Sequence, residues 1–423
     1  MNTGDTAWLL ASSALVLLMT PGLAFFYGGM VRSKTVLNMM MMSFIALAIV
    51  PVLWVLYGYS MSFSPNGNRW LGGWDRLGLD HIGQGTLYGT IPEYVFVAFQ
   101  LMFAIITVAL ISGAIADRAK FGSWAVFIVI WMTVVYFPVA HWVFDFGDTG
   151  GWIATKLKAF DFAGGTAVHI NAGAAGLALA LVLGKRVGWK RDPMRPHNLP
   201  FVLLGSGLLW FGWFGFNAGS AVGANGLAGL AYVNTAVSTA AAMLGWLAVE
   251  VLRDSKATSL GAASGAVAGL VAITPACGTV SPVGSIALGI IAGILCALAV
   301  GLKYKLGFDD SLDVVGVHLV GGIAGTLLIG LFATKTNAGG KAAAGLFYGG
   351  DLSQLGKQAV AVVAVLAYSF ILTYIIGTLI QKTIGFRIDE ESEVIGIDQV
   401  EHLETAYDYA GSSTGGSTLT KEH

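Results

Sequence analysis

Two histidines lie inside apolar segments of the chain, each eight residues after an aspartate. Asp161 precedes His169 and Asp310 precedes His318, so the two pairs are 149 residues apart. The surrounding residues also match, reading VHINAGAAG around the first histidine and VHLVGGIAG around the second. An ionisable side chain within an apolar segment is costly and by default indicates a functional site. Two neutral imidazoles can share one hydrogen bond, so each histidine is a natural partner for the other.

A single buried histidine is more commonly a core residue whose ring bonds a backbone carbonyl, and that alternative stays open for each ring alone. The mirrored pair favours a functional interpretation. We therefore predict that His169 and His318 meet inside the protein as two neutral rings that line a pore.

The elements that position these histidines must be membrane helices. The chain has 423 residues and is 56% hydrophobic but only 11% charged, whereas soluble domains are about 25% charged. Windows of about 20 apolar residues, enough to cross a bilayer, recur along it, and they are too long and unbroken for a transmembrane β-barrel. The 58 glycines suit close packing of membrane helices. We predict an all-α polytopic membrane protein with eleven spans, at 6–30, 36–63, 91–115, 121–144, 162–184, 199–219, 228–252, 259–275, 281–302, 311–333 and 358–384.

The spacing of the histidines predicts an internal repeat, with helices 1–5 and 6–10 as the two copies and a long eleventh helix after them. Five is an odd number, so the second copy must cross the membrane in the opposite sense, which is a transporter architecture. Eight helical residues advance about 12 Å, and half of the hydrocarbon core is about 15 Å. Both histidines should therefore reach the middle of the membrane from opposite sides.

The basic residues predict the orientation. Sixteen of the 23 lysines and arginines fall in one set of alternating loops, and such residues gather on the cytoplasmic side. We predict a multi-pass protein of the cell membrane with its N-terminus outside, and no basic stretch marks the first helix for cleavage as a signal. Residues 1–384 would form the membrane domain and 385–423 a cytoplasmic regulatory tail, with a Ser/Thr/Gly-rich end that is expected to be disordered.

The carboxylates beside the repeat have two interpretations. Asp161 stands before a Gly-Gly-Thr helix start, where it can cap backbone N–H groups and complement the helix dipole; the alternative is that its charge attracts a cation to the pore entrance. The same two roles apply to Asp310 and Asp313 at the other side, with Asp309 predicted to be solvated. The two cysteines are expected to be buried packing residues, and no metal or cofactor site is predicted.

Several longer motifs occur in order along the chain. The first runs from Asp161 to Arg186 as DFAGGTAVHINAGAAGLALALVLGKR. Others are PGLAFFYGG from Pro21, AFQ from Ala98, PHNLP from Pro196, WFGFNAGS from Trp213, TPACG from Thr274 and DDSLDVVGVH from Asp309. Together they closely resemble the Amt branch of the Amt/Rh ammonium transporter family. The resemblance implies a transporter rather than an enzyme, assembled as a homotrimer with one pore in each subunit.

The resemblance also implies an outer site that recruits the ammonium ion with aromatic faces and a hydroxyl. By motif position, Ser220 would supply the hydroxyl and Trp213 and Phe216 would lie nearby. Phe103 would stack on Phe216 as a gate above the histidines. Taken alone, each aromatic residue is more simply a packing residue, and the serine could bond the carbonyl four residues earlier.

Two further residues complete the implied site. Phe144 occupies the position where the family has a tryptophan, and its smaller ring is a weaker partner for a cation. Thr274, in the TPACG motif, is expected to support the site without binding the ion.

The implied function is recruitment of ammonium, its deprotonation, and conduction of ammonia past the histidine pair into the cytoplasm, with methylammonium as an analogue. Potassium cannot shed a proton and would be excluded; whether the released proton also crosses is left open. In the tail, GFRI from Gly385, GID from Gly396 and EHLETAY from Glu401 resemble the family's cytoplasmic C-terminus and imply contact with a PII-type nitrogen-regulatory protein. The lipid bilayer is a further partner, and no nucleic acid is expected.

Three other functions compete with this one. The first is a passive Rh-like channel for ammonia or carbon dioxide, and the second is an ammonium sensor that acts through the tail. The third is an unrelated ion-coupled transporter or membrane enzyme. The sequence contains no phosphate loop, nucleophile with a base, or metal-ligand cluster that would favour the third.

Overall fold

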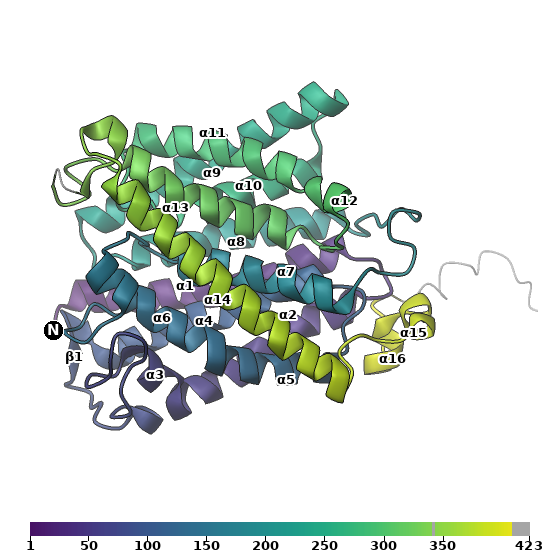
Figure 1. Cartoon of the computed structure of the whole chain (residues 1–423), viewed down its shortest axis with the longest axis horizontal. Helices are drawn as coiled ribbons and strands as arrows, with labels where there is room; N and C mark the ends of the chain where they lie inside the picture. Colours follow the sequence, from purple (N-terminus) through teal and green to yellow (C-terminus); the bar gives the residue numbers. More distant parts are fainter. Residues whose placement is uncertain (341–342, 408–423) are drawn as a thin grey trace, which may run out of the picture.

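The computed structural model describes residues 1–340 and 343–407 as a single bundle of helices (Figure 1). Within these residues, ten helices are long and apolar enough to cross a membrane. An eleventh apolar helix, Ser259–Ile273, is shorter and lies at the position of the predicted eighth span. The predicted all-α polytopic fold is confirmed, and every predicted span agrees with an observed helix to within five residues at each end.

The spans are built from α-helices and short π-helical or 3₁₀ turns. The α-helices are α1 (Thr3–Met30), α2 (Val36–Leu53), α3 (Tyr59–Phe63), α4 (Glu93–Ile111), α5 (Phe121–Trp131), α6 (Phe137–Phe144), α7 (Asn171–Leu183), α8 (Leu199–Gly219), α9 (Gly226–Asp254), α10 (Ser259–Ile273), α11 (Pro282–Ala299), α12 (Leu302–Leu306), α13 (Val320–Phe332), α14 (Ser353–Thr383), α15 (Glu390–Ile395) and α16 (Ile397–His402). The π-helical turns are η1 (Trp54–Gly58), η4 (Met132–Tyr136), η5 (Ile153–Leu157), η6 (Gly165–Ile170) and η7 (Val315–Leu319). The 3₁₀ turns include η2 (Leu77–Leu79), η3 (Ser112–Ile115) and η9 (Leu346–Tyr348), and a small antiparallel hairpin pairs β1 (Leu87–Tyr88) with β2 (Ile91–Pro92).

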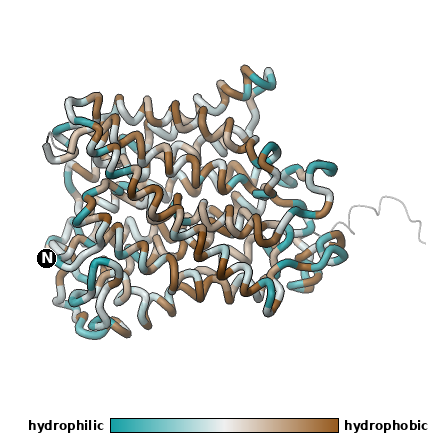
Figure 2. Tube along the Cα trace, in the orientation of Figure 1, coloured by the Kyte–Doolittle hydropathy of each residue, from teal (hydrophilic) through white to brown (hydrophobic). Residues whose placement is uncertain are grey.

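The bundle has two polar ends and an apolar middle. Figure 2 shows hydrophobic residues along the middle of the helices and hydrophilic residues at both ends. One end carries the N-terminus and the β1–β2 hairpin, and the opposite end carries α15 and α16 (Figure 1). We call these the N-terminal end and the tail end. Their separation agrees with an odd number of crossings between them.

The first helices of the two predicted repeats, α1 and α8, pack along each other. Glycines permit this close approach. A Cβ added at Gly205 of α8 would lie 2.3 Å from the backbone nitrogen of Phe26, and one added at Gly22 of α1 would lie 3.0 Å from the Cβ of Leu208. Small residues at such contacts are typical of membrane helices, where close van der Waals packing drives association.

The π-helical turns were not predicted from the sequence. Two of them adjoin prolines, since η1 begins three residues after Pro51 and η4 ends two residues before Pro138. Proline lacks an N–H group and disturbs the regular α-helical ladder. The other two that matter here, η6 and η7, contain His169 and His318, which fits the frequent occurrence of π turns at functional sites.

The described part of the tail packs against the tail end of the bundle. The backbone N–H of Ile388 donates to the carbonyl of Arg118 over 3.0 Å, and the N–H of Lys120 donates to the carbonyl of Phe386 over 2.9 Å. The short helices α15 and α16 follow. The segment predicted to be disordered, 411–420, lies outside the described residues.

Candidate functional site

The structure brings His169 and His318 together. Their Nδ1 atoms are 3.2 Å apart and their ring planes are inclined by 21°. Both rings are buried, with 1% and 3% of their surface exposed. The hydrogen bond uses one nitrogen of each ring, and His169 Nε2 has no partner among the described residues. The pair thus has the contact that the mirrored sequence spacing predicted.

Two glycines allow the histidine segments to touch. A Cβ added at Gly173, four residues after His169, would lie 2.7 Å from the Cα of Leu319, the neighbour of His318. A Cβ added at Gly322, four residues after His318, would lie 3.0 Å from a side-chain carbon of Ile170, the neighbour of His169. Each segment therefore contacts the other through equivalent residues, as two-fold symmetry requires. This reciprocity supports the predicted inverted repeat.

Trp213 lies beside the histidine pair. Its ring stacks on His169, with centroids 5.4 Å apart and planes inclined by 18°. The indole N–H donates to the hydroxyl oxygen of Thr274 over 2.8 Å, and that hydroxyl donates to the carbonyl of Leu270. Thr274 therefore supports the site by fixing the indole. Trp213 stands at the level of the histidines, about two helical turns away from Ser220, the serine beside which the motif position put it.

A narrow apolar cavity runs past the two histidines. Its volume is about 10 Å³, close to the space that a single water molecule needs. Phe103 and Phe216 close the cavity towards the N-terminal end, with ring centroids 4.2 Å apart. The lining is apolar apart from His169, His318 and the indole of Trp213, and consists of Met19, Leu23, Phe26, Ile106, Leu110, Val168, His169, Leu209, Trp213, Phe216, Val267 and His318.

A second cavity, which we call the aromatic cavity, lies on the other side of Phe103. Its volume is about 70 Å³. It contains the predicted Phe103, Phe144 and Ser220 together with residues that the sequence did not identify. The complete lining is Tyr88, Phe96, Phe99, Gln100, Phe103, Phe144, Phe146, Phe162, Ser220 and Val222. Gln100 and Phe162 belong to motifs quoted above, so their position could have been noticed.

Ser220 makes the bond to the carbonyl four residues earlier that the sequence left open, and its position is compatible with the recruiting role. Its hydroxyl donates to the carbonyl of Phe216, four residues earlier, over 2.8 Å, and the residue also lines the aromatic cavity. A hydroxyl whose hydrogen is already used still has lone pairs that accept hydrogen bonds. Ser220 is therefore suited to a ligand that donates. Phe144 lies within 6.3 Å of Phe103, measured between ring centroids.

Asp161 has the capping role predicted for it. Its carboxylate accepts the backbone N–H groups of Gly164, Gly165 and Thr166 at 2.6–2.7 Å, as well as the Thr166 hydroxyl. Burial raises the pKa of Asp161, and these hydrogen bonds oppose that rise. The start of the first histidine segment is therefore fixed by one carboxylate.

At the tail end, the three aspartates before His318 have different roles. Asp310 caps the second histidine segment by accepting from the N–H groups of Val314 and Val315. Asp313 accepts from Lys303 Nζ over 2.7 Å instead of capping. The prediction that Asp309 is solvated was wrong, because it is fully buried and binds Arg186 through two 2.9 Å contacts. Burial acts to raise the pKa of Asp309, but the hydrogen bonds from Arg186 outweigh it and the pKa is lowered.

Comparison with known proteins identifies the family. The model of the Ammonium Transporter Family matches residues 7–407. An ammonium transporter of Mycobacterium tuberculosis is 61% identical over 441 residues, covering 98% of this chain and 92% of that protein. The chain belongs to the Ammonium Transporter Family. Among solved structures, Candida albicans Mep2 is 36% identical with a TM-score of 0.84, covering 93% of this chain and 88% of that one. A structure described as a sensor Amt protein is 28% identical with a TM-score of 0.86, covering 94% and 98%.

Membership of this family confirms the ammonium transport that the motifs imply. The chain is a multi-pass membrane protein that transports ammonium, and it is not an enzyme. The resemblance to the Amt branch agrees with the names of these relatives.

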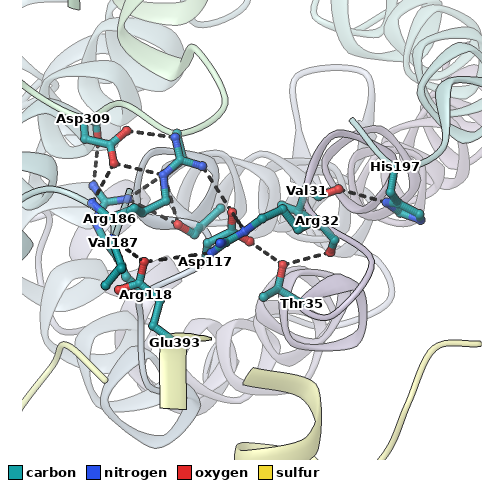
Figure 3. Close-up of polar contacts among 12 residues, drawn as sticks. Val31, Arg32, Thr35, Asp117, Arg118, Arg186, Val187, His197, Asp309 and Glu393 are labelled. Carbon is teal, nitrogen blue, oxygen red and sulfur yellow. Dashed lines mark hydrogen bonds and ion pairs between the residues drawn. The ribbon is translucent and has the colours of Figure 1, made fainter. Parts of the chain in front are cut away.

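In this ammonium transporter, a buried ionic network joins the loops at the tail end to the tail (Figure 3). Arg186 contacts Asp117 as well as Asp309, and Asp117 also contacts Arg32 at 3.2 Å. Glu393 of the tail is fully buried and accepts from the N–H of Val187 over 2.7 Å. The network was missed in the sequence because its members come from five separate segments.

Arg118, also drawn in Figure 3, contacts this network through the backbone of Asp309 and is fully buried. Its guanidinium donates to backbone carbonyls, including that of Asp309, and to the Ser311 hydroxyl. Burial lowers the pKa of Arg118 to about 10, so it stays charged at neutral pH. The loop before the second histidine segment is therefore held by a cation as well as by its own aspartates.

Proposed function

We propose that the protein recruits the ammonium ion in the aromatic cavity, removes its proton, and conducts ammonia past His169 and His318. The observation that carries this proposal is the 3.2 Å contact between the two Nδ1 atoms inside a cavity of about 10 Å³. A cavity this narrow and apolar accepts a small neutral molecule. A hydrated cation does not fit it.

Recruitment is supported by the composition of the aromatic cavity. A cation over an aromatic face gains about 0.5–2 kcal/mol, depending on desolvation, and Phe103 and Phe144 supply such faces. The lone pairs of Ser220 can accept one N–H of the ion. An intact charge costs more at the middle of a bilayer than these contacts return, so deprotonation before the gate is favoured.

The gate must move for anything to pass. Phe103 and Phe216 have 1% and 0% of their surface exposed and are stacked 4.2 Å apart. The two buried rings must therefore rotate away from each other before ammonia can pass. The two rings thus separate the aqueous end from the histidines while still opening for ammonia.

The histidine pair can replace water as a partner for ammonia. In the Nδ1–Nδ1 hydrogen bond one ring donates and the other accepts, so in neutral rings one Nε2 is a bare acceptor and the other is an N–H donor. Ammonia can both donate and accept, and it can therefore bond along the pair. Potassium carries a charge that it cannot lose, and the pathway excludes it.

We also propose the orientation, assembly and partners that the sequence predicts. The distribution of lysine and arginine supports an N-terminus outside the cell membrane and a cytoplasmic tail end. On this orientation the aromatic cavity faces outwards. The motif resemblance supports a homotrimer with one pore per subunit, and large apolar side chains exposed on α9 and α11, such as Leu244 and Val283, would face lipid or the other subunits.

The tail is proposed to be a regulatory segment, residues 385–423, beside a membrane domain of residues 1–384. Its described part is joined to the membrane domain by Glu393, which accepts from the N–H of Val187, and by Asp398, which accepts from the N–H groups of Leu37 and Asn38 at the start of α2. Through these contacts, a PII-type regulatory protein bound at the tail end would act on the loops around the pore exit. Pull-down of a purified PII protein by liposomes carrying the full chain, and not by a chain ending at residue 384, is the expected result.

The test of the pathway is labelled methylammonium uptake by purified protein in liposomes, with ammonium and potassium as competitors. The double variant His169→Ala, His318→Ala should lose ammonium conduction or let potassium compete. The matched control is His81→Ala, which removes an exposed histidine at the N-terminal end. Normal and selective transport by the double variant would refute the assignment.

The same liposomes separate the two other transport hypotheses. On an ammonium pulse to a solid-supported membrane, a passive Rh-like pathway for neutral ammonia gives no sustained current, whereas proton transfer with ammonia does. A protein that acts only as a sensor would show no uptake. A similar solved structure is described as a sensor Amt protein. The uptake measurement therefore also decides between a transporter and a protein that acts only as a sensor.

A further inference from the structure

A third histidine, His141, is bound at both ring nitrogens by backbone carbonyls. It lies in the last turn of α6 and is fully buried. Its Nδ1 is 2.9 Å from the carbonyl oxygen of Ser62, and its Nε2 is 2.7 Å from that of Asn68. A carbonyl oxygen can only accept a hydrogen bond, so the ring must donate at both nitrogens. Only the imidazolium form has two N–H groups.

A carboxylate balances this charge. Asp145 Oδ2 is 3.3 Å from His141 Nδ1, and Asp145 Oδ1 accepts the backbone N–H of Gly147 over 2.9 Å. A buried charge needs such a partner, because desolvation alone is expensive. The other charged groups on the adjoining loops are engaged elsewhere or exposed: Arg69 donates to Thr155, Asp75 accepts from Ser64, and Asp148 is exposed.

We call the contacts of His141 with Ser62, Asn68 and Asp145 the histidine clamp. The histidine clamp fixes the segment that lines the aromatic cavity. It ties α6 to Ser62 of α3 and to the loop at Asn68. The following loop is pressed against the same turn, because a Cβ added at Gly151 would lie 2.0 Å from the carbonyl oxygen of His141. Phe144 and Phe146, which flank Asp145, both line the aromatic cavity. The positions of these two rings therefore depend on the turn that His141 holds.

We propose that His141, held as an imidazolium by two backbone carbonyls and Asp145, is a positioning residue that sets the geometry of the aromatic cavity for ammonium. This inference rests on the proposed recruitment at that cavity. The imidazolium does not touch the substrate, and its charge is neutralised by Asp145. Its effect on transport passes through Phe144 and Phe146.

The protonation state is tested by solid-state NMR of protein labelled with ¹⁵N-histidine in liposomes at about pH 8, where an ordinary histidine is neutral. Of the seven histidines, one should show both ring nitrogens protonated, and His141→Gln should remove that signal. The absence of a doubly protonated ring at this pH, or its persistence in His141→Gln, would overturn the proposal.

The positioning role is tested by Asp145→Asn, which keeps both carbonyl acceptors but removes the balancing charge. We expect the KM for methylammonium to rise by roughly threefold to tenfold while kcat changes by less than about twofold. The matched control, Asp148→Asn, removes an exposed carboxylate three residues later and should change neither property.

An unchanged KM in Asp145→Asn, or an equal change in the control, would refute the positioning role. These results are independent of the histidine pair. If the proposed pathway is wrong, the double variant at His169 and His318 transports normally while the NMR signal of His141 remains. If His141 is not held as an imidazolium, that signal is missing while the double variant at His169 and His318 still loses transport.

Discussion

The two glycines at the histidine contact predict unequal effects for the same substitution at equivalent positions of the repeat. In Gly173→Ala the new Cβ would lie 2.5 Å from the backbone nitrogen of Leu319. Ordinary van der Waals contact begins at 3.4 Å, so the two segments must separate by about 0.9 Å. The Nδ1 atoms of His169 and His318, now 3.2 Å apart, would then be beyond hydrogen-bond distance.

In Gly322→Ala the closest atom is a side-chain carbon of Ile170 at 3.0 Å, so a shift of about 0.4 Å restores ordinary contact. Alanine is favoured over glycine in a helix by about 1 kcal/mol. That gain should offset the small strain at Gly322. At Gly173 the gain from alanine's helix preference is opposed by an overpacking cost of about 1–3 kcal/mol. Loss of the histidine hydrogen bond costs a further amount of about 0.5–1.5 kcal/mol.

The assay is thermal unfolding in detergent together with methylammonium uptake in liposomes. Gly173→Ala should unfold at a lower temperature and lose most transport, whereas Gly322→Ala should remain within about 1 kcal/mol of the parent protein and keep transport. Gly356→Ala is the control, because a Cβ there meets no atom within 4 Å. Equal effects at Gly173 and Gly322, or parental transport by Gly173→Ala, would refute the reasoning.

Three further substitutions test separate parts of the pathway. Ser220→Ala should raise the KM for ammonium by about tenfold, the value of a hydrogen bond to a charged group, with flux at saturating ammonium retained; equal loss at every concentration would contradict recruitment by this hydroxyl. Phe144→Trp should lower the KM by about twofold to fivefold, because indole is the stronger cation partner, and an unchanged concentration dependence would remove this ring from the site. Arg186→Ala should lower the free energy of unfolding by about 3–5 kcal/mol, since it leaves the buried Asp309 unpaired, whereas Arg253→Ala, which breaks an exposed pair with Asp254, should cost less than about 1 kcal/mol.

The helices and the histidine contact could be predicted because they follow from periodic features of the sequence. Apolar windows define the spans, and the 149-residue repeat requires His169 and His318 to occupy equivalent positions. The position of Asp161 and Asp310 before the two repeated histidine segments also predicted that these aspartates cap helix starts. None of these inferences depends on knowing how loops fold.

The features that were missed depend on contacts between distant segments. Asp309 and Asp310 are adjacent and chemically identical, and only Arg186, more than one hundred residues earlier, determines that the first is buried in an ion pair. Phe146 reaches the aromatic cavity from a loop and Tyr88 reaches it from the two-residue strand β1, and neither segment has hydrophobic periodicity. Trp213 is placed beside His169 by its hydrogen bond to Thr274, which motif position alone does not specify.

The symmetry of the core and the asymmetry of its ends have different consequences for transport. The equivalent glycines and the shared hydrogen bond make the centre of the pathway similar from either side, so the histidine pair itself gives ammonia no preferred direction. The two ends differ in chemistry, with phenylalanines and a serine at the N-terminal end and a buried network of arginines and carboxylates at the tail end. An aromatic cavity attracts a cation without binding it as an ion pair, whereas the tail end holds its charges in fixed pairs that link to the tail through the contacts of Glu393 with Arg32 and Val187. Under the proposed function, selection of the ion is therefore assigned to the first end and control of the pathway to the second.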